Sequence, residues 1–251
     1  MRRPSSLMGL FLFLCACLSN TAAALTFSHV DNEGAAYTVI RVDPKHDKLQ
    51  LFPAPSVDNK VAPGFAAIVE QARAHRQTLR FAMNAGMFEA DLSPVGLLVA
   101  NGVQVSALNS SQGYGNFYLK PNGVFLLDQG GAHIVESSEY AGLHGAVTLA
   151  TQSGPLLLRH GIEHPAFHAT SSSRLTRNGV GIDAQGMLVF VISDSGVNFH
   201  QFAMLFRDVL HCDDALYLDG TVSSLYAPEL GRNDAKVKLG PVIGVVAGVL
   251  D

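Results

Sequence analysis

Hydrophobic and polar positions alternate along much of the first third of the chain. This alternation predicts strands at residues 35–43 and 48–52. Between residues 64 and 75 the apolar positions instead recur at intervals of three and four, which predicts a helix. An uninterrupted apolar run at residues 79–84 then predicts a buried strand.

The middle of the chain is divided into short apolar runs by glycine and asparagine. We predict a hairpin at residues 96–105 that turns at Asn101 and Gly102, a dipeptide that readily adopts positive φ angles. Two more short strands are predicted at residues 115–119 and 123–127, with a turn between them.

The second half has longer and clearer patterns. Residues 179–183 and 187–194 predict a hairpin, and residues 198–211 predict an amphipathic helix with Asn198 as its N-cap. Strands follow at 215–219 and 240–250. The order strand, helix, strand around residues 187–219 predicts a crossover unit.

These elements predict an α/β or α+β fold. We expect one domain at residues 25–251, with a mixed, largely β sheet core and a few flanking helices. The sequence contains no internal repeat, low-complexity tract or obvious linker that would divide this domain.

Residues 1–24 have the pattern of a signal peptide. Two arginines precede an apolar run at residues 7–18, and Ala22 and Ala24 provide the small residues of a cleavage site. We therefore expect an exported protein, periplasmic or secreted, that begins at residue 25. In the alternative, the sequence around Cys17 is a lipoprotein box and Cys17 carries a lipid anchor.

Composition limits the classes of partner. The formal net charge is −4, with scattered lysines, and this argues against a nucleic-acid partner. The apolar run at residues 7–18 is shorter than the roughly 20 residues that cross a bilayer. We expect no membrane-spanning segment after it.

Five predicted strands or turns run into polar side chains and glycine. A rigid scaffold can direct side chains at strand ends into a shared cleft. A turn would explain each one alone, but turns do not require an arginine, carboxylates, a glutamine and serines. The polar residues are Asn84 with Glu89, Gln152 with Ser153, Arg177 with Asn178, Asp194 with Ser195, and Asp219 with Ser223 and Ser224.

In this order the five blocks resemble the phosphodiester glycosidase family, in particular an exported bacterial branch of it. The matching segments read NAGMF from Asn84, QSGP from Gln152, RNGVG from Arg177, SDSG from Ser193 and LDGTVSS from Leu218. The resemblance covers roughly residues 37–249. Three positions depart from the family pattern, namely Ala85 and Thr221, where the family has glycine, and Asn178, where it has threonine.

The resemblance implies a hydrolase that removes a sugar from a phosphodiester in an envelope polymer or another glycan. Such a substrate requires a cation for the phosphate and carboxylates at the anomeric carbon. We assign Arg177 to the phosphate, Asp219 as nucleophile or base and Asp194 as its partner. Sugar hydroxyls or phosphate oxygens are assigned to Asn84, Gln152, Ser223 and Ser224, and His164 is expected to line the cleft.

Other interpretations of these residues stay open. Asp194 could cap the following helix, Arg177 could be a surface arginine, the two serines could form an ordinary turn, and Glu89 is either a third carboxylate or an exposed loop residue. The whole protein could be a non-catalytic glycan-binding envelope protein that keeps the cleft, which the three departures from the family pattern would explain.

A metal-dependent phosphodiesterase is a further alternative. His160, His164 and His168 are four residues apart, but Gly161 and Pro165 interrupt the helix that would align them. We therefore expect no metal and no cofactor.

Overall fold

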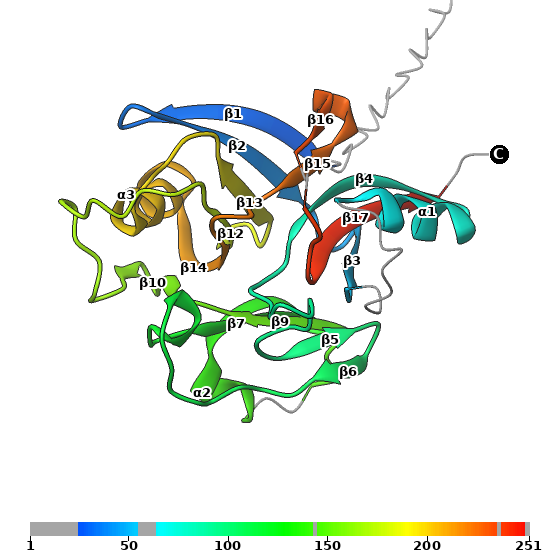
Figure 1. Cartoon of the computed structure of the whole chain (residues 1–251), viewed down its shortest axis with the longest axis horizontal. Helices are drawn as coiled ribbons and strands as arrows, with labels where there is room; N and C mark the ends of the chain where they lie inside the picture. The colour runs from blue at the N-terminus through cyan, green and yellow to red at the C-terminus, as the bar shows by residue number, and fades with distance from the viewer. Residues whose placement is uncertain (1–24, 55–63, 143–144, 235–236, 249–251) are drawn as a thin grey trace, which may run out of the picture.

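The computed structural model describes residues 25–54, 64–142, 145–234 and 237–248, so the segment assigned as a signal peptide lies outside the described residues. Its strands form three sheets (Figure 1). The first sheet has the order β1 (Thr26–Asn32), β2 (Ala35–Val42), β13 (Leu188–Ser193), β12 (Asn178–Asp183), β14 (Cys212–Asp219), β10 (Leu156–Arg159) and β11 (Ile162–Glu163).

The second and third sheets have five strands each. The second has the order β16 (Arg232–Asn233), β15 (Leu225–Ala227), β4 (Gln77–Asn84), β17 (Val242–Gly248) and β3 (Lys48–Phe52). The third has the order β6 (Val103–Ser106), β5 (Leu98–Ala100), β9 (Leu149–Ser153), β7 (Gly123–Asp128) and β8 (Gly131–Glu136).

The three sheets enclose one apolar core. Phe190 of the first sheet packs against Phe81 of the second, with ring centroids 5.3 Å apart, and against Phe125 of the third, with centroids 6.1 Å apart. All three side chains are fully buried. Each sheet therefore contributes its inner face to the same core, and the hydrophobic effect holds the three together.

Helices cover the outer faces of two sheets (Figure 1). On the first sheet, α3 (Phe199–Met204) continues into a π-helical turn, η2 (Leu205–Val209), and this helix buries Phe202 and Phe206 against the sheet. On the second sheet, α1 (Ala66–Ala74) buries Ile68 and Ala72. The remaining helical segments are short: α2 (Ser137–Tyr140), η1 (Asn116–Tyr118) and η3 (Pro228–Leu230).

The predicted crossover unit is present. Strands β13 and β14 both pair antiparallel with β12, so they run parallel to each other with β12 between them. The helix between them begins where predicted, because the Asn198 side chain accepts a hydrogen bond of 2.9 Å from the Gln201 amide.

The predicted fold class is confirmed, since the chain is largely β with few helices. Hydrogen-bonded neighbours among the described strands pair antiparallel, and they form three sheets where we expected one. The hairpin at Asn101 and Gly102 is also confirmed, with φ angles of 51° and 76° at these residues.

Two local predictions need correction. Residues 115–119 do not form a strand, because Gly115 has a φ of 94° and the chain turns into the 3₁₀ helix η1. The predicted helix at residues 198–211 is shorter and changes from α to π geometry at Leu205. Among the described residues, no helix is long and apolar enough to cross a membrane.

Candidate active site

Asp219 lies at the end of β14, where the first sheet approaches the second. Its side chain is largely buried, with 8% of the residue exposed. Oδ2 accepts a hydrogen bond of 3.0 Å from Nδ2 of Asn84, which ends β4 in the second sheet. Oδ1 accepts a hydrogen bond of 2.6 Å from the Gly220 amide. The carboxylate is therefore fixed by one donor from the loop after β14 and one donor from the second sheet.

Burial raises the pKa of Asp219 from its ordinary value of 3.8 to about 6. The hydrogen bonds from Gly220 and Asn84 favour the charged form and oppose this rise. The carboxyl group thus titrates near neutral pH, as a catalytic acid or base requires.

Asn84 connects Asp219 to the loop that follows β14. Its Oδ1 accepts a hydrogen bond of 2.8 Å from the Ser224 amide, and its carbonyl oxygen accepts one of 2.8 Å from Nδ2 of Asn178. Ser223 completes the network, since its Oγ lies 3.1 Å from Oδ1 of Asn178 and 2.9 Å from the Asp219 carbonyl oxygen. Asn84, Asp219, Ser223 and Ser224 are therefore brought together as a single polar cluster.

Two buried hydrogen bonds also join the third sheet to the backbone beside Asn84 and Asp219. Thr151 donates a hydrogen bond of 2.9 Å to the Ala85 carbonyl oxygen, and Ser153 donates one of 2.8 Å to the Leu218 carbonyl oxygen. The β12–β14 ladder shifts register just before Asp219, an irregularity of the kind that redirects side chains beside active sites. Asp219 thus lies where all three sheets are connected by buried hydrogen bonds.

The departures from the family pattern fit this environment. Ala85 is fully buried in the central core, so its methyl group adds apolar contact. Asn178 joins the polar cluster through both ends of its side-chain amide. Thr221 is exposed.

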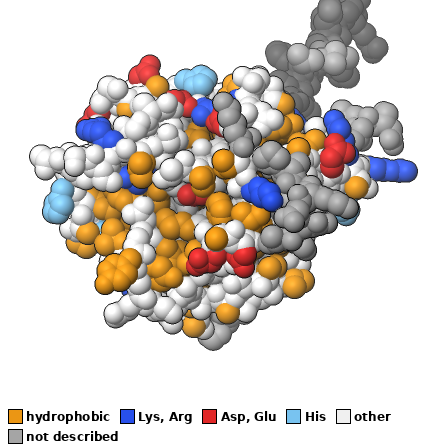
Figure 2. Space-filling model, in the orientation of Figure 1, with side chains coloured by type: hydrophobic (Ala, Val, Ile, Leu, Met, Phe, Trp, Pro, Cys, Tyr) orange, Lys and Arg blue, Asp and Glu red, His pale blue; other side chains and the backbone are white. Residues whose placement is uncertain are grey.

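A cleft of about 460 Å³ opens beside Asp219. Hydrophobic side chains gather in the hollow on the face shown in Figure 2, with acidic side chains close by. Five of the lining residues come from the loop around η1. The lining residues are Met87, Phe88, Glu89, Val95, Tyr114, Gly115, Asn116, Phe117, Tyr118, Asp219 and Val222.

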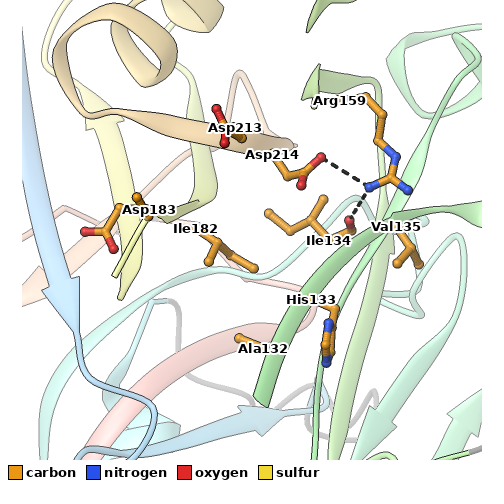
Figure 3. Close-up of a pocket in the computed structure, with 10 residues that line it drawn as sticks. Ala132, His133, Ile134, Val135, Arg159, Ile182, Asp183, Asp213 and Asp214 are labelled. Carbon is orange, nitrogen blue, oxygen red and sulfur yellow. Dashed lines mark hydrogen bonds and ion pairs between the residues drawn. The ribbon is translucent and has the colours of Figure 1, made fainter. Parts of the chain in front are cut away.

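Two other cavities of the described structure lie away from Asp219. One of about 290 Å³ lies between the first and third sheets (Figure 3). There Nη1 of Arg159 lies 3.2 Å from both Oδ1 of Asp214 and the Ile134 carbonyl oxygen, so the Arg159 and Asp214 charges are already paired. A cavity of about 470 Å³ is lined by hairpin turns near Asp128 and Gln185. We therefore place the candidate active site at the Asp219 cleft.

Gln152 and His164, both expected to contact substrate, are buried and occupied elsewhere. The Gln152 amide makes four hydrogen bonds, to the Leu97 and Asn109 amides, the Asn109 carbonyl oxygen and Ser137 Oγ. His164 is 4% exposed, and burial lowers the pKa of its imidazole. Its ring stacks on Phe167, with centroids 4.8 Å apart. Neither residue lines the cleft.

Arg177 is buried, not on the surface, with 1% of the residue exposed. Its Nε donates a hydrogen bond of 2.8 Å to the Val197 carbonyl oxygen, and its Nη2 donates one of 3.1 Å to the Ser173 carbonyl oxygen. The guanidinium carbon lies 3.7 Å from the centre of the Phe199 ring. Burial lowers the pKa of this guanidinium.

Asp194 is separated from Asp219. Strand β12 lies between β13, which ends just before Asp194, and β14, so two strand spacings of roughly 4.8 Å each separate the two backbones. Its Oδ1 pairs with Nη1 of Arg232 at 2.5 Å, and its Oδ2 accepts a hydrogen bond of 3.0 Å from Thr38. Within the described residues, no group of three or more His, Cys, Asp or Glu side chains is arranged to hold a metal ion.

Comparison with known proteins assigns the family. The model of the phosphodiester glycosidase family matches residues 77–246, which include β4, β12, β14 and every residue of the polar cluster. The chain belongs to the phosphodiester glycosidase family. A relative in Escherichia coli K12, the uncharacterized protein YigE, is 38% identical over 148 residues, which make up 59% of this chain and 58% of that protein.

Solved structures share the fold of this phosphodiester glycosidase family member. The catalytic domain of zebrafish N-acetylglucosamine-1-phosphodiester alpha-N-acetylglucosaminidase, auto-inhibited by its pro-peptide, aligns with a TM-score of 0.63 and 14% identity over 90% of this chain and 84% of that one. A hypothetical protein from Synechocystis aligns with a TM-score of 0.54 and 17% identity over 89% of this chain and 62% of that one.

Sequence reasoning missed most of the cleft wall. Tyr114, Asn116 and Tyr118 come from the segment around residues 115–119, which we predicted to contain a strand. Tyr114 is fully exposed in the cleft. The polar run that contains Tyr114, NSSQGYG at residues 109–115, was the available signal, because a loop rich in glycine and serine can extend over a neighbouring strand end.

The raised pKa of Asp219 predicts a specific dependence of stability on pH. Because the folded state holds this proton more tightly than the unfolded state, its contribution to stability is complete below about pH 4 and is lost as pH rises through about 6. Asp219→Asn removes this loss. Relative to wild type, the variant should gain up to roughly 3 kcal/mol in free energy of unfolding between pH 4 and pH 7.

Urea unfolding of both proteins across this pH range measures the difference. A difference that stays constant from pH 4 to pH 7 would contradict the raised pKa.

Proposed function

We propose that the protein is a hydrolase that cleaves a sugar from a sugar-1-phosphodiester. The observation that carries this proposal is the Asp219 carboxyl group, which faces a cleft with a pKa of about 6 in a member of the phosphodiester glycosidase family. A carboxylate beside the anomeric carbon stabilises the positive charge that develops there as the glycosidic bond breaks.

In the proposed reaction, water is added across the bond between C1 of the sugar and the phosphate oxygen. That bond breaks, its electron pair stays with the phosphate oxygen, and a phosphomonoester leaves. Asp219 acts either as the nucleophile at C1 or as the base that takes a proton from the attacking water. Since phosphate is a good leaving group, the reaction depends little on a general acid.

Binding roles follow from the polar cluster. Ser223 is half-buried beside Asp219, which supports a role in holding a sugar hydroxyl or a phosphate oxygen. Asn84 and the Ser224 amide serve mainly to fix the carboxylate. Arg177 supplies positive charge behind β14. The assignments of Gln152 and His164 as substrate ligands stay predictions, although both side chains lie outside the cleft wall.

A non-catalytic glycan-binding protein is the alternative. Of the three departures that suggest it, Ala85 fills the core and Asn178 supports Asp219 through Asn84. These roles are as compatible with an intact catalytic site as with a binding site. Thr221 remains as the one change without a structural role. The two functions differ in turnover, which the assay below measures.

Catalysis by Asp219 is tested by Asp219→Asn on a panel of sugar-1-phosphodiesters. We expect kcat to fall by roughly 10²–10⁴-fold, because the amide can neither attack C1 nor accept a proton. In wild type, kcat/KM should rise tenfold per pH unit up to about pH 6 and then level off, as the carboxyl group ionises. Released sugar is the measured product.

The matched control is Asp213→Asn, since Asp213 is exposed near the opposite end of the same strand and should tolerate the change at full rate. Asn84→Ala removes a hydrogen bond that lowers the Asp219 pKa, so its pH profile should shift to higher pH. Binding without turnover in wild type would favour the glycan-binding alternative, and full activity in folded Asp219→Asn would exclude the assigned role.

The second carboxylate has two candidates. Asp194 was assigned from sequence, but it is paired with Arg232, whereas Glu89 is exposed and lines the cleft. The geometry therefore favours Glu89. We expect Glu89→Gln to lower kcat at least tenfold and Asp194→Asn mainly to lower stability, because Arg232 loses a partner. The reverse pattern in kcat and unfolding measurements would restore Asp194 as the partner.

We propose that the protein is exported, on the strength of the arginines, apolar run and small residues within positions 1–24. Mass spectrometry of the protein purified from its own cells should find a mature chain that begins at Leu25. A lipidated chain that begins at Cys17 would establish the lipoprotein alternative, and an unprocessed chain that begins at Met1 would contradict both.

A further inference from the structure

Arg177 has one donor that the fold leaves unused. Its Nε and Nη2 are bound to backbone carbonyl oxygens, but Nη1 has no hydrogen-bond partner within the described structure. Buried donors, and those of a charged group above all, are usually paired. The side chains that pack against the guanidinium determine which group Nη1 can reach.

Tyr217 is the polar aromatic residue next to it. The guanidinium carbon lies 5.4 Å from the centre of the Tyr217 ring, and Phe199, which stacks under Arg177, meets Tyr217 edge-on with centroids 4.8 Å apart. Both Tyr217 and Arg177 are 1% exposed. Packing therefore holds the phenol ring and the guanidinium in a fixed relation.

The hydroxyl end of Tyr217 lies beside Gly220, close to the Asp219 carboxyl group at the cleft. A Cβ atom placed on Gly220 would come within 2.3 Å of Tyr217 Oη, so the hydroxyl lies directly behind the residue that follows Asp219. This close approach explains why glycine is needed at position 220. Asn116, which lines the cleft together with Asp219, is also near the hydroxyl, because hydrogen bonding to Asn116 lowers the pKa of Tyr217.

The phenol stays protonated. Burial raises the pKa of Tyr217 to about 12, although the positive charge of Arg177 and hydrogen bonding to Asn116 lower it in part. At neutral pH the hydroxyl is therefore a donor, and its oxygen can also accept a hydrogen bond from a guanidinium.

We propose that Tyr217 donates a hydrogen bond to a phosphate oxygen of the substrate and that Arg177 positions it, with Nη1 donating to Tyr217 Oη. The inference rests on the proposed function and adds to it the group that contacts the phosphate. No covalent bond is made or broken in this chain of hydrogen bonds. As C1 separates from the phosphate oxygen, the phosphate gains negative charge, and the Tyr217 donor stabilises that charge.

Arg177 then acts through Tyr217 without touching the substrate. A donor whose oxygen itself accepts from a cation is a stronger donor, since chains of hydrogen bonds polarise one another. This arrangement accounts for both a buried cation with an unused donor and a buried phenol whose hydroxyl lies beside Gly220. It also brings positive charge to the phosphate while the guanidinium stays out of water.

The test uses Tyr217→Phe in the full-length protein, which keeps the ring packing and removes only the hydroxyl. We expect kcat on sugar-1-phosphodiesters to fall by roughly 10²-fold and the Kd for inorganic phosphate to rise at least tenfold. The matched control is Tyr37→Phe. Tyr37 is a fully buried tyrosine in the same apolar cluster whose hydroxyl has no partner in the described structure, so both values should stay unchanged.

The positioning role of Arg177 is tested by a double-mutant cycle. If Arg177 acts through Tyr217, adding Arg177→Gln to Tyr217→Phe should cost no further phosphate affinity, whereas two independent contacts would lose affinity multiplicatively. Arg177→Lys, which keeps the charge, replaces Arg177→Gln in the cycle if the glutamine variant does not fold.

The two proposals can fail separately. If wild type releases no sugar from any phosphodiester, the proposed function fails, and phosphate titration still decides the role of Tyr217. If wild type turns over but Tyr217→Phe keeps its full rate and phosphate affinity, only the Tyr217 inference is overturned. A wild-type protein that does not bind phosphate would overturn it as well.

Discussion

A buried carboxylate is the constraint on which this structure depends. Asp219 lies at the junction of three sheets, and a charge there is costly unless donors surround it. Two donors come from different places in the chain, the Gly220 amide next to it and the Asn84 side chain 135 residues away in sequence. The first and second sheets must therefore be joined correctly for the carboxylate to be held at all.

The same junction explains why so many polar groups are buried near the core. Thr151 and Ser153 attach the third sheet to backbone carbonyl oxygens beside Asn84 and Asp219. Asn178 attaches β12 to the Asn84 carbonyl oxygen. Each bond satisfies a strand end that cannot continue its own ladder. The result is a rigid support for one partly exposed carboxyl group, as catalytic geometry requires.

Local patterns predicted the elements well because their causes are local. The Asn101-Gly102 turn, the Asn198 cap and the apolar strand at residues 79–84 were found from a few neighbouring residues each. The division into three sheets was not, because it depends on contacts such as Phe190 with Phe81 and Phe125 that no local pattern encodes. The segment at 115–119 misled because Gly115 adopts a positive φ that its apolar neighbours do not indicate.

For the site, the strand ends indicated a cluster of Asp219, Asn84, Ser223 and Ser224, because Asn84 ends β4, Asp219 ends β14 and the two serines follow Asp219. They could not show which side chains are already bonded. Gln152 uses its amide internally and Asp194 is paired with Arg232, and only three-dimensional contacts reveal this. The pattern also gave no reason to select Tyr217, which reads as one more apolar residue of β14.

The central claim is that Asp219 faces the anomeric carbon of a phosphodiester-linked sugar. The most direct measurement is a crystal structure of Asp219→Asn with an uncleaved sugar-1-phosphodiester bound. We expect C1 of the sugar within roughly 3–3.5 Å of the side chain at position 219 or of a water held by it, with the phosphate inside the same cleft. A sugar bound elsewhere, or in this cleft with C1 directed away from position 219, would contradict the assignment.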